Sequence, residues 1–138
     1  MGSKYILDTN ILIRFFTNDP KEQAEIVEEI FLAAEGKSLI IPDVVLVEAV
    51  FVLLSLYELP KEAIVEKMSS LITYDKFDLH RALFQKTLEL YSKYSISFVD
   101  AYIGAKSGTK PTFPVYTFDK KILGIKEIRT IEPGKQQD

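Results

Sequence analysis

The chain has 138 residues, of which 47% are hydrophobic and 27% charged, and it contains no cysteine and a single histidine, His80. This composition indicates one globular domain and excludes a disordered chain. It also excludes a disulfide scaffold and a zinc site built on cysteines. The net charge of −3 argues against nucleic-acid binding through a generally basic surface.

Charge is distributed unevenly along the chain. Residues 1–69 carry 6 Lys and Arg against 12 Asp and Glu, whereas residues 70–138 carry 11 against 8. A polyanionic partner would therefore bind the C-terminal half of the chain, although charges scattered over a solvated surface would give the same counts of basic and acidic residues.

Nothing in the sequence predicts a membrane segment. The N-terminus runs from Lys4 directly into a strand-like run, without the pattern of a secretory signal. The longest apolar stretch, residues 44–56, is interrupted by Glu48 and is too short to cross a bilayer. We therefore expect a soluble, cytoplasmic protein with no membrane partner, and the absence of cysteine is consistent with a reducing compartment.

Short strand-like runs alternate with helical patterns, which predicts parallel strands joined by crossover helices and hence an α/β fold. The runs lie at residues 4–7, 38–41, 114–118 and, more weakly, 129–131. We expect a single domain over residues 1–138, with a helical insertion at about residues 44–95 between the second and third strands and a short tail at residues 133–138.

Helix signals separate these runs. Asp19 and Pro20 indicate the start of a helix that ends near Gly36, because Asp caps helices and Pro suits the first helical position. Further helices are predicted at about residues 44–57, from Pro60 to about residue 72, after a cap at Asp78, and over residues 98–106 between Ser97 and Gly108.

Two acidic residues follow predicted strands directly. Asp8 ends the first strand and Asp119 ends the third, and the carboxyl ends of parallel strands are where ligands bind in such sheets. Either residue alone is also explained as a helix cap. Asp43, after the second strand, is interpreted as a cap rather than a ligand.

Glu48 and Asp100 each stand alone in an apolar helix. Glu48 is the single charge in residues 44–54, and a helix with apolar residues on nearly all sides is expected to be buried on nearly all sides. A buried carboxylate is costly unless it is paired or bound to a metal, so either a Lys or Arg partner or a functional role is expected. Asp100 is the single charge in residues 96–105, where the helix macrodipole also favours an acid.

These four acids share one chemical use. Clustered carboxylates repel one another and require cations, and oxygen ligands without His or Cys select Mg²⁺ or Mn²⁺ over zinc. Such ions activate water and stabilise leaving oxygens on phosphates. Hydrolysis of phosphodiesters is therefore the natural reaction for a site of this kind.

Four short stretches together resemble a PIN domain, and most closely the small VapC-type ribonuclease toxins and their archaeal relatives. They are Asp8-Thr9-Asn10 after a strand, Glu48 on an apolar helix, Phe98-Val99-Asp100-Ala101, and Thr117-Phe118-Asp119. The resemblance covers essentially the whole chain. It implies a three-layer α/β/α fold with a central, mostly parallel sheet of about four to five strands.

The resemblance also implies an activity and a site. Asp8, Glu48, Asp100 and Asp119 would be an acidic quartet that holds one or two Mg²⁺ or Mn²⁺ ions, and Asn10 and Thr117 would orient ligands or waters around it. The reaction would be metal-dependent endonucleolytic cleavage of RNA. Members of the family are commonly homodimers, and the toxins are inhibited by a small antitoxin protein.

Basic residues near these stretches are candidates for contacts with RNA. Arg14 follows Asp8 on a helix, and Lys106 and Lys120 flank the later acids, as do Lys110 and Lys121. Each one alone is better explained as a solvated surface residue. His80 is interpreted as structural or exposed, because nothing near it suggests a catalytic triad.

Two other functions remain open from the sequence. The first is a PIN-like binding or scaffold module that has lost catalysis, although all four acids are present. The second is a receiver-type signalling domain, which also has an acidic Mg²⁺ pocket. Receivers need paired acids after the first strand, whereas here a single Asp follows it and Glu48 lies within a helix.

Overall fold

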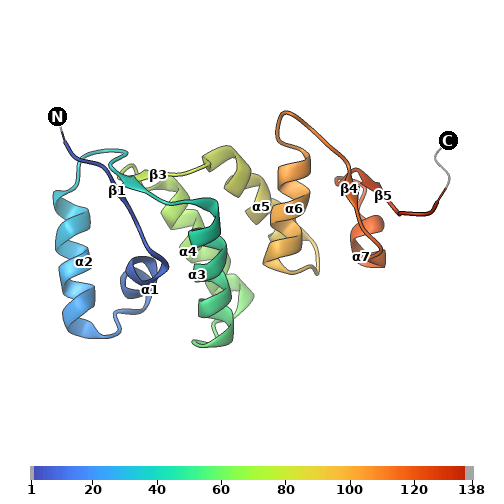
Figure 1. Cartoon of the computed structure of the whole chain (residues 1–138). Coiled ribbons are helices and arrows are strands. Elements are labelled where there is room, and N and C mark those ends of the chain that lie inside the picture. Colours follow the sequence, from blue (N-terminus) through green and yellow to red (C-terminus); the bar gives the residue numbers. More distant parts are fainter. Residues whose placement is uncertain (1, 136–138) are drawn as a thin grey trace. The chain divides into compact units, whose positions relative to one another are not determined.

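The computed structural model describes residues 2–135. The chain forms two compact units, of which the first ends at His80 and the second begins at Arg81 (Figure 1). The expectation of one domain over the whole chain stays a prediction.

The first unit is built on a three-stranded parallel sheet. Its strands are β1 (Tyr5–Ile6), β2 (Leu39–Ile40) and β3 (Phe77–Asp78), in the order β1-β2-β3. Helical crossovers connect them, as parallel strands require. The helices α1 (Thr9–Thr17) and α2 (Lys21–Ala33) join β1 to β2, and α3 (Asp43–Ser55) and α4 (Lys61–Thr73) join β2 to β3.

Strand β3 corrects the prediction that residues 44–95 are a purely helical insertion. Asp78 pairs with Ile40 in the sheet and does not cap a helix, since the next helix begins at Arg81. The local sequence has too few apolar residues to indicate a strand. Tertiary packing decides its conformation, because Phe77 is fully buried against other aromatic rings.

An aromatic cluster packs the core of the first unit. The rings of Phe31 and Phe77 meet edge to face at 5.2 Å between centroids, and Phe15 contacts Phe31 at 4.9 Å. These separations lie in the favourable range for aromatic pairs. The cluster therefore joins α1, α2 and β3 and holds the sheet under its helices.

Proline marks three helix starts in this unit, but at the N-cap position and not at the first helical residue. Pro20, Pro42 and Pro60 precede α2, α3 and α4, and none of these helices has a side-chain cap. The predicted caps at Asp19 and Asp43 are therefore wrong. The extended proline backbone directs the chain into each helix, while Asp19 accepts a hydrogen bond from the Tyr57 hydroxyl at 3.1 Å.

The second unit contains a helix pair and a two-stranded parallel sheet. Its elements are α5 (Arg81–Lys93), α6 (Phe98–Ser107), β4 (Val115–Tyr116), α7 (Lys120–Leu123) and β5 (Thr130–Ile131). Tyr91 packs on Phe98 at 5.4 Å between ring centroids. Gly104 permits close approach to α6, because a Cβ there would lie 2.5 Å from Ile128 Cδ1.

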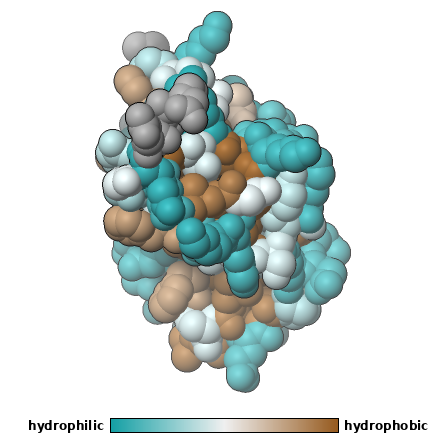
Figure 2. Space-filling view, turned by 90° about the vertical axis from the view of Figure 1, so that its right-hand side faces the viewer, coloured by the Kyte–Doolittle hydropathy of each residue, from teal (hydrophilic) through white to brown (hydrophobic). Residues whose placement is uncertain are grey.

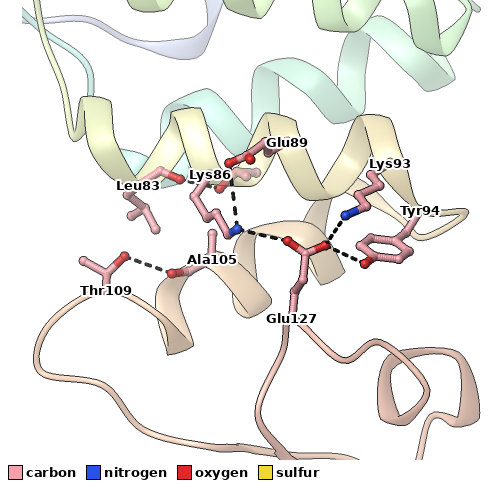
Figure 3. A network of polar contacts seen from close by, with 9 residues as sticks. Leu83, Lys86, Glu89, Lys93, Tyr94, Ala105, Thr109 and Glu127 are labelled. Atoms are coloured by element: carbon pink, nitrogen blue, oxygen red, sulfur yellow. Dashed lines mark hydrogen bonds and ion pairs between the residues drawn. The ribbon is translucent and has the colours of Figure 1, made fainter.

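A polar network fastens the segment after α7 to α5 within the second unit (Figure 3). The Glu127 carboxylate accepts hydrogen bonds from the Tyr94 hydroxyl and from Lys93 Nζ at 2.9 Å, and Lys86 Nζ lies 3.4 Å away. These donors lower the pKa of Glu127 to about 2, the Tyr94 hydroxyl most of all, and the same carboxylate raises the pKa of Lys93. The network therefore holds the segment after α7 against α5.

Apolar side chains remain on the surface beside hydrophilic ones (Figure 2). In the first unit the exposed face of α2 includes Ile26 and Ile30, and in the second Phe113 and Phe118 are more than half exposed. No helix within residues 2–135 is long and apolar enough to span a membrane.

Candidate functional site

Asp8 lies where β1 ends and α1 begins. One of its carboxylate oxygens, Oδ1, accepts a hydrogen bond from the Thr9 backbone N–H at 2.8 Å, so Asp8 does cap α1. The other, Oδ2, faces Asn10 Nδ2 at 3.4 Å. Capping therefore gives Oδ1 a short hydrogen bond and leaves Oδ2 with only a long one.

Thr9 connects Asp8 to Glu48 within the first unit. Its hydroxyl donates a hydrogen bond to Glu48 Oε1, while its backbone N–H binds Asp8. The side chain of Thr9 is buried, which fixes the hydroxyl in place. Thr9 is not among the candidate site residues chosen from the sequence, although its position between Asp8 and Asn10 could have indicated a role.

The expected burial of Glu48 is wrong. Helix α3 packs through the side that carries Leu46, Ala49, Val50 and Leu53, whereas Glu48 is exposed and Val44 and Phe51 on its side are 73% and 64% exposed. Because apolar residues surround this helix on all sides, its sequence does not indicate which side the rest of the unit covers. The carboxylate therefore stands on an open apolar face of the first unit.

Asp100 lies in the first turn of α6 in the second unit. Ser97 caps this helix as predicted, by accepting a hydrogen bond from the Asp100 backbone N–H at 3.0 Å. The Asp100 carboxylate itself has no hydrogen bond or ion pair to any residue in the range 2–135. The helix N-terminus favours its charge without neutralising it.

Asp119 follows β4 and caps α7. Its Oδ1 accepts hydrogen bonds from the backbone N–H groups of Lys121 at 2.8 Å and Ile122 at 3.4 Å. Thr117 Oγ1 accepts a hydrogen bond from the Asp119 backbone N–H at 3.0 Å and so fixes the turn. The second carboxylate oxygen has no partner among the described residues.

The four acids share one electrostatic property. None lies within 4 Å of a Lys, Arg or His nitrogen in residues 2–135, whereas Asp43, Asp78, Glu127 and Glu132 all do. Asp8 and Glu48 belong to the first unit, and Asp100 and Asp119 to the second. Among the described residues no group of three or more His, Asp or Glu side chains is gathered in a way that could hold a metal.

Comparison with known proteins identifies the family. The model of the PIN domain matches residues 5–127, which is most of the chain. The chain belongs to the PIN domain family. It is also 26% identical over 132 residues to a VapC ribonuclease of Aquifex aeolicus (strain VF5), an alignment that covers 92% of this chain and 97% of that protein.

Membership of the PIN family confirms the fold class expected from the sequence. The PIN domain is a three-layer α/β/α fold, and the structure describes a three-stranded and a two-stranded sheet, both parallel, where the sequence predicted one central sheet of about four to five strands. The matched residues begin at β1 and end after α7, so they contain all four acids.

The basic residues that the sequence suggests for contacts with RNA differ in whether they already have a partner. Arg14 Nε donates a hydrogen bond to Gln23 Oε1 at 2.7 Å, and Lys120 Nζ pairs with Glu132 at 2.9 Å. Lys106 has no such partner in the described part of the chain. Lys106 is therefore the one of these three whose charge is available to a ligand.

Asp43 and His80 form a separate pair in the first unit. His80 Nδ1 lies 2.8 Å from Asp43 Oδ1, at the carboxyl ends of β2 and β3, beside a shallow cavity of about 330 Å³. The His80 side chain is 68% exposed, as the interpretation of an exposed histidine anticipated. Surface pairs of this kind contribute little to stability.

Proposed function

We propose that this PIN domain is a metal-dependent endoribonuclease whose acidic quartet is Asp8, Glu48, Asp100 and Asp119. The observation that carries the proposal is the match to the PIN family over a segment that includes all four acids. The geometry is compatible with the proposal, because each of the four carboxylates retains at least one oxygen without a strong hydrogen bond.

The donor set suits Mg²⁺ or Mn²⁺. All four side chains are carboxylates, which are hard oxygen ligands, and the chain has no cysteine to favour a softer metal. When bound, such an ion lowers the pKa of a coordinated water and stabilises the charge that develops on the phosphate oxygens.

The remaining roles fall to residues of the chain. Thr9 holds Glu48 through its hydroxyl and Asp8 through its backbone N–H, so it keeps both carboxylates oriented. Asn10 supports Asp8, and Thr117 sets the turn that presents Asp119. These contacts restrict carboxylate rotation before a ligand arrives, and such preorganisation is what a metal site requires of its outer residues.

We further propose a role in a VapBC-type toxin–antitoxin pair or in related RNA processing. The similarity to a VapC ribonuclease over 92% of the chain supports this assignment. The expected partners are an RNA substrate, a second copy of the chain and a small antitoxin protein. The exposed apolar side chains of α2 and α3 give such proteins a surface on which to dock.

The test is cleavage of a mixed cellular RNA pool with Mn²⁺ by the wild type and by Asp8→Asn. Asp43→Asn is the matched control, since it also removes one strand-end carboxylate but lies outside the quartet. We expect cleavage by the wild type and by Asp43→Asn, and loss of cleavage in Asp8→Asn and with chelator.

Each outcome separates the alternatives. Equal cleavage by the wild type and Asp8→Asn identifies a contaminating nuclease and removes the support for this site. RNA binding without cleavage by any preparation favours a catalytically silent binding module. Light scattering of the purified protein tests the dimer independently, because it does not depend on activity.

A further inference from the structure

A cavity of about 420 Å³ opens on the second unit, beside the C-terminal half of α6. Apolar groups form much of its wall, among them Ile103, Pro111 and Val115, and Ser107 and Thr109 contribute hydroxyls. Lys106, Lys110 and Phe113 also line it. The cavity lies wholly within residues 103–115.

Its cations are not neutralised. Neither Lys106 nor Lys110 has a hydrogen bond or ion pair within residues 2–135, whereas Lys86, Lys93, Lys120 and Lys135 of the same unit are paired with glutamates. The unit as a whole is basic, with ten Lys and Arg against six Asp and Glu in residues 81–138. An anionic ligand therefore gains attraction here without displacing an internal partner.

An aromatic ring stands beside these two charges. Phe113 is 65% exposed, so its ring is accessible to a ligand. Its backbone is fixed by a hydrogen bond from the Phe113 N–H to the Ser107 carbonyl at 3.2 Å. An exposed ring on an anchored loop offers a face on which a planar group can stack.

The cavity shares a helix face with Asp100. Ile103 and Ser107 follow Asp100 at spacings of three and seven residues, so the three lie on one side of α6. Lys106 lies six positions after Asp100, which is a rise of about 9 Å along a helix axis. A short extended oligonucleotide spans this distance.

We propose that this cavity is a subsite for single-stranded RNA, in which a base stacks on Phe113 and the adjoining phosphates contact Lys106 and Lys110. This inference rests on the proposed function, because it takes the strand to continue from Asp100 along α6. Proteins that bind single-stranded nucleic acid without reading its sequence commonly combine positive charges that contact the phosphates with an aromatic ring on which a base stacks. An acidic peptide could neutralise the two lysines, but it has no need of an aromatic ring on which to stack.

The test measures binding of a fluorescein-labelled mixed-sequence RNA 12-mer to the full-length protein by anisotropy. Ca²⁺ replaces Mn²⁺, and a gel confirms that the RNA stays intact. The cavity variants are Phe113→Ala and the double variant Lys106→Ala/Lys110→Ala. The control Lys21→Ala/Lys126→Ala removes the same charge at exposed positions elsewhere, and thermal melts confirm that every variant is folded.

We expect Phe113→Ala to weaken binding at least about fivefold, the lower end for loss of one base–aromatic stack. The lysine double variant should lower the slope of log K against log salt by about 1.4, which corresponds to two phosphate contacts on a single strand. The control variant should bind as the wild type does.

The other results decide separately on the subsite and on the nuclease. Binding by both cavity variants that equals the wild type, while the wild type cleaves RNA with Mn²⁺, removes the subsite and leaves the nuclease assignment intact. A wild type that neither binds nor cleaves RNA contradicts both. Binding of a Glu/Leu-rich peptide through Phe113 in place of RNA assigns the cavity to a protein partner. Weaker RNA binding by the variants, with no cleavage by any preparation, supports the subsite and contradicts the nuclease.

Discussion

Removing the Thr9 hydroxyl should weaken Mn²⁺ binding at the proposed quartet without unfolding the protein. Thr9→Val replaces the hydroxyl by a methyl group of nearly the same shape, so the hydrogen bond to Glu48 is lost while the backbone bond to Asp8 stays. Hydrogen bonds to charged groups contribute about 1.5–3 kcal/mol, and the lower end applies to the exposed Glu48. Loss of such an outer contact typically lowers metal affinity about 10–100-fold.

Calorimetric titration with Mn²⁺ in the absence of RNA measures this effect directly. We expect Thr9→Val to bind Mn²⁺ about tenfold more weakly than the wild type, and Thr9→Ser, which keeps the hydroxyl, to remain close to it. The Mn²⁺ concentration needed for half-maximal RNA cleavage should rise by the same factor. Thermal melts without metal should show all three proteins folded, with Thr9→Val destabilised by no more than about 1.5 kcal/mol, the contribution of the lost hydrogen bond.

Binding of Mn²⁺ by Thr9→Val as tightly as by the wild type would refute the role of the Thr9 hydroxyl. It is also refuted if Thr9→Ser loses as much affinity as Thr9→Val, because the effect would then come from packing of the buried methyl group and not from the hydroxyl.

Three further predictions concern pH, packing and metal. The pKa of Glu127 is lowered to about 2 from its ordinary value near 4.5. Its polar network therefore stabilises the fold above pH 4.5, and this stabilisation is lost as the pH falls toward 2. Urea denaturation should show the wild type to be more stable than Glu127→Gln at pH 7, and the difference in the free energy of unfolding should shrink below pH 4.5. Phe31→Ala should lower the free energy of unfolding by about 3–5 kcal/mol in the same assay, since the ring is fully buried between Phe15 and Phe77. Mn²⁺ at one hundred times its Kd should stabilise the wild type by about 2.7 kcal/mol in thermal melts, and Asp8→Asn by much less.

Each of these has a contradicting result. A pH-independent difference between wild type and Glu127→Gln would mean that the carboxylate acts through packing. A loss well under about 1 kcal/mol for Phe31→Ala would show that the aromatic cluster is loosely packed. An equal Mn²⁺ shift in wild type and Asp8→Asn would place the bound ion away from the quartet.

The helices and the parallel strand type were predictable because their signals are local. Ser97 caps α6 and Gly108 ends it. Short strand-like runs that alternate with helical patterns indicated that the strands are parallel. The stretches that resemble a PIN domain, from Asp8 to Asp119, were also recognisable because each is short and of characteristic type, and the family match over residues 5–127 contains them.

Strand β3 and the environment of Glu48 were not predictable, because both depend on residues distant in sequence. Phe77 becomes part of a strand only by pairing with β2 and packing on Phe31. The apolar residues of α3 surround the helix, so only its contacts with α1 and α4 decide which side is covered and leave Glu48 exposed.

The sequence alone determined the family, the quartet of candidate acids and the kind of metal that they suit, since these depend on residue type and order. Only the tertiary structure decided which polar groups are already engaged. It links Thr9 to Glu48, pairs Lys120 with Glu132, and leaves Lys106 and Lys110 without partners beside Phe113 among the described residues. Hydrogen bonds and ion pairs form between side chains that the fold brings within a few ångströms, and spacing along the chain does not specify that distance.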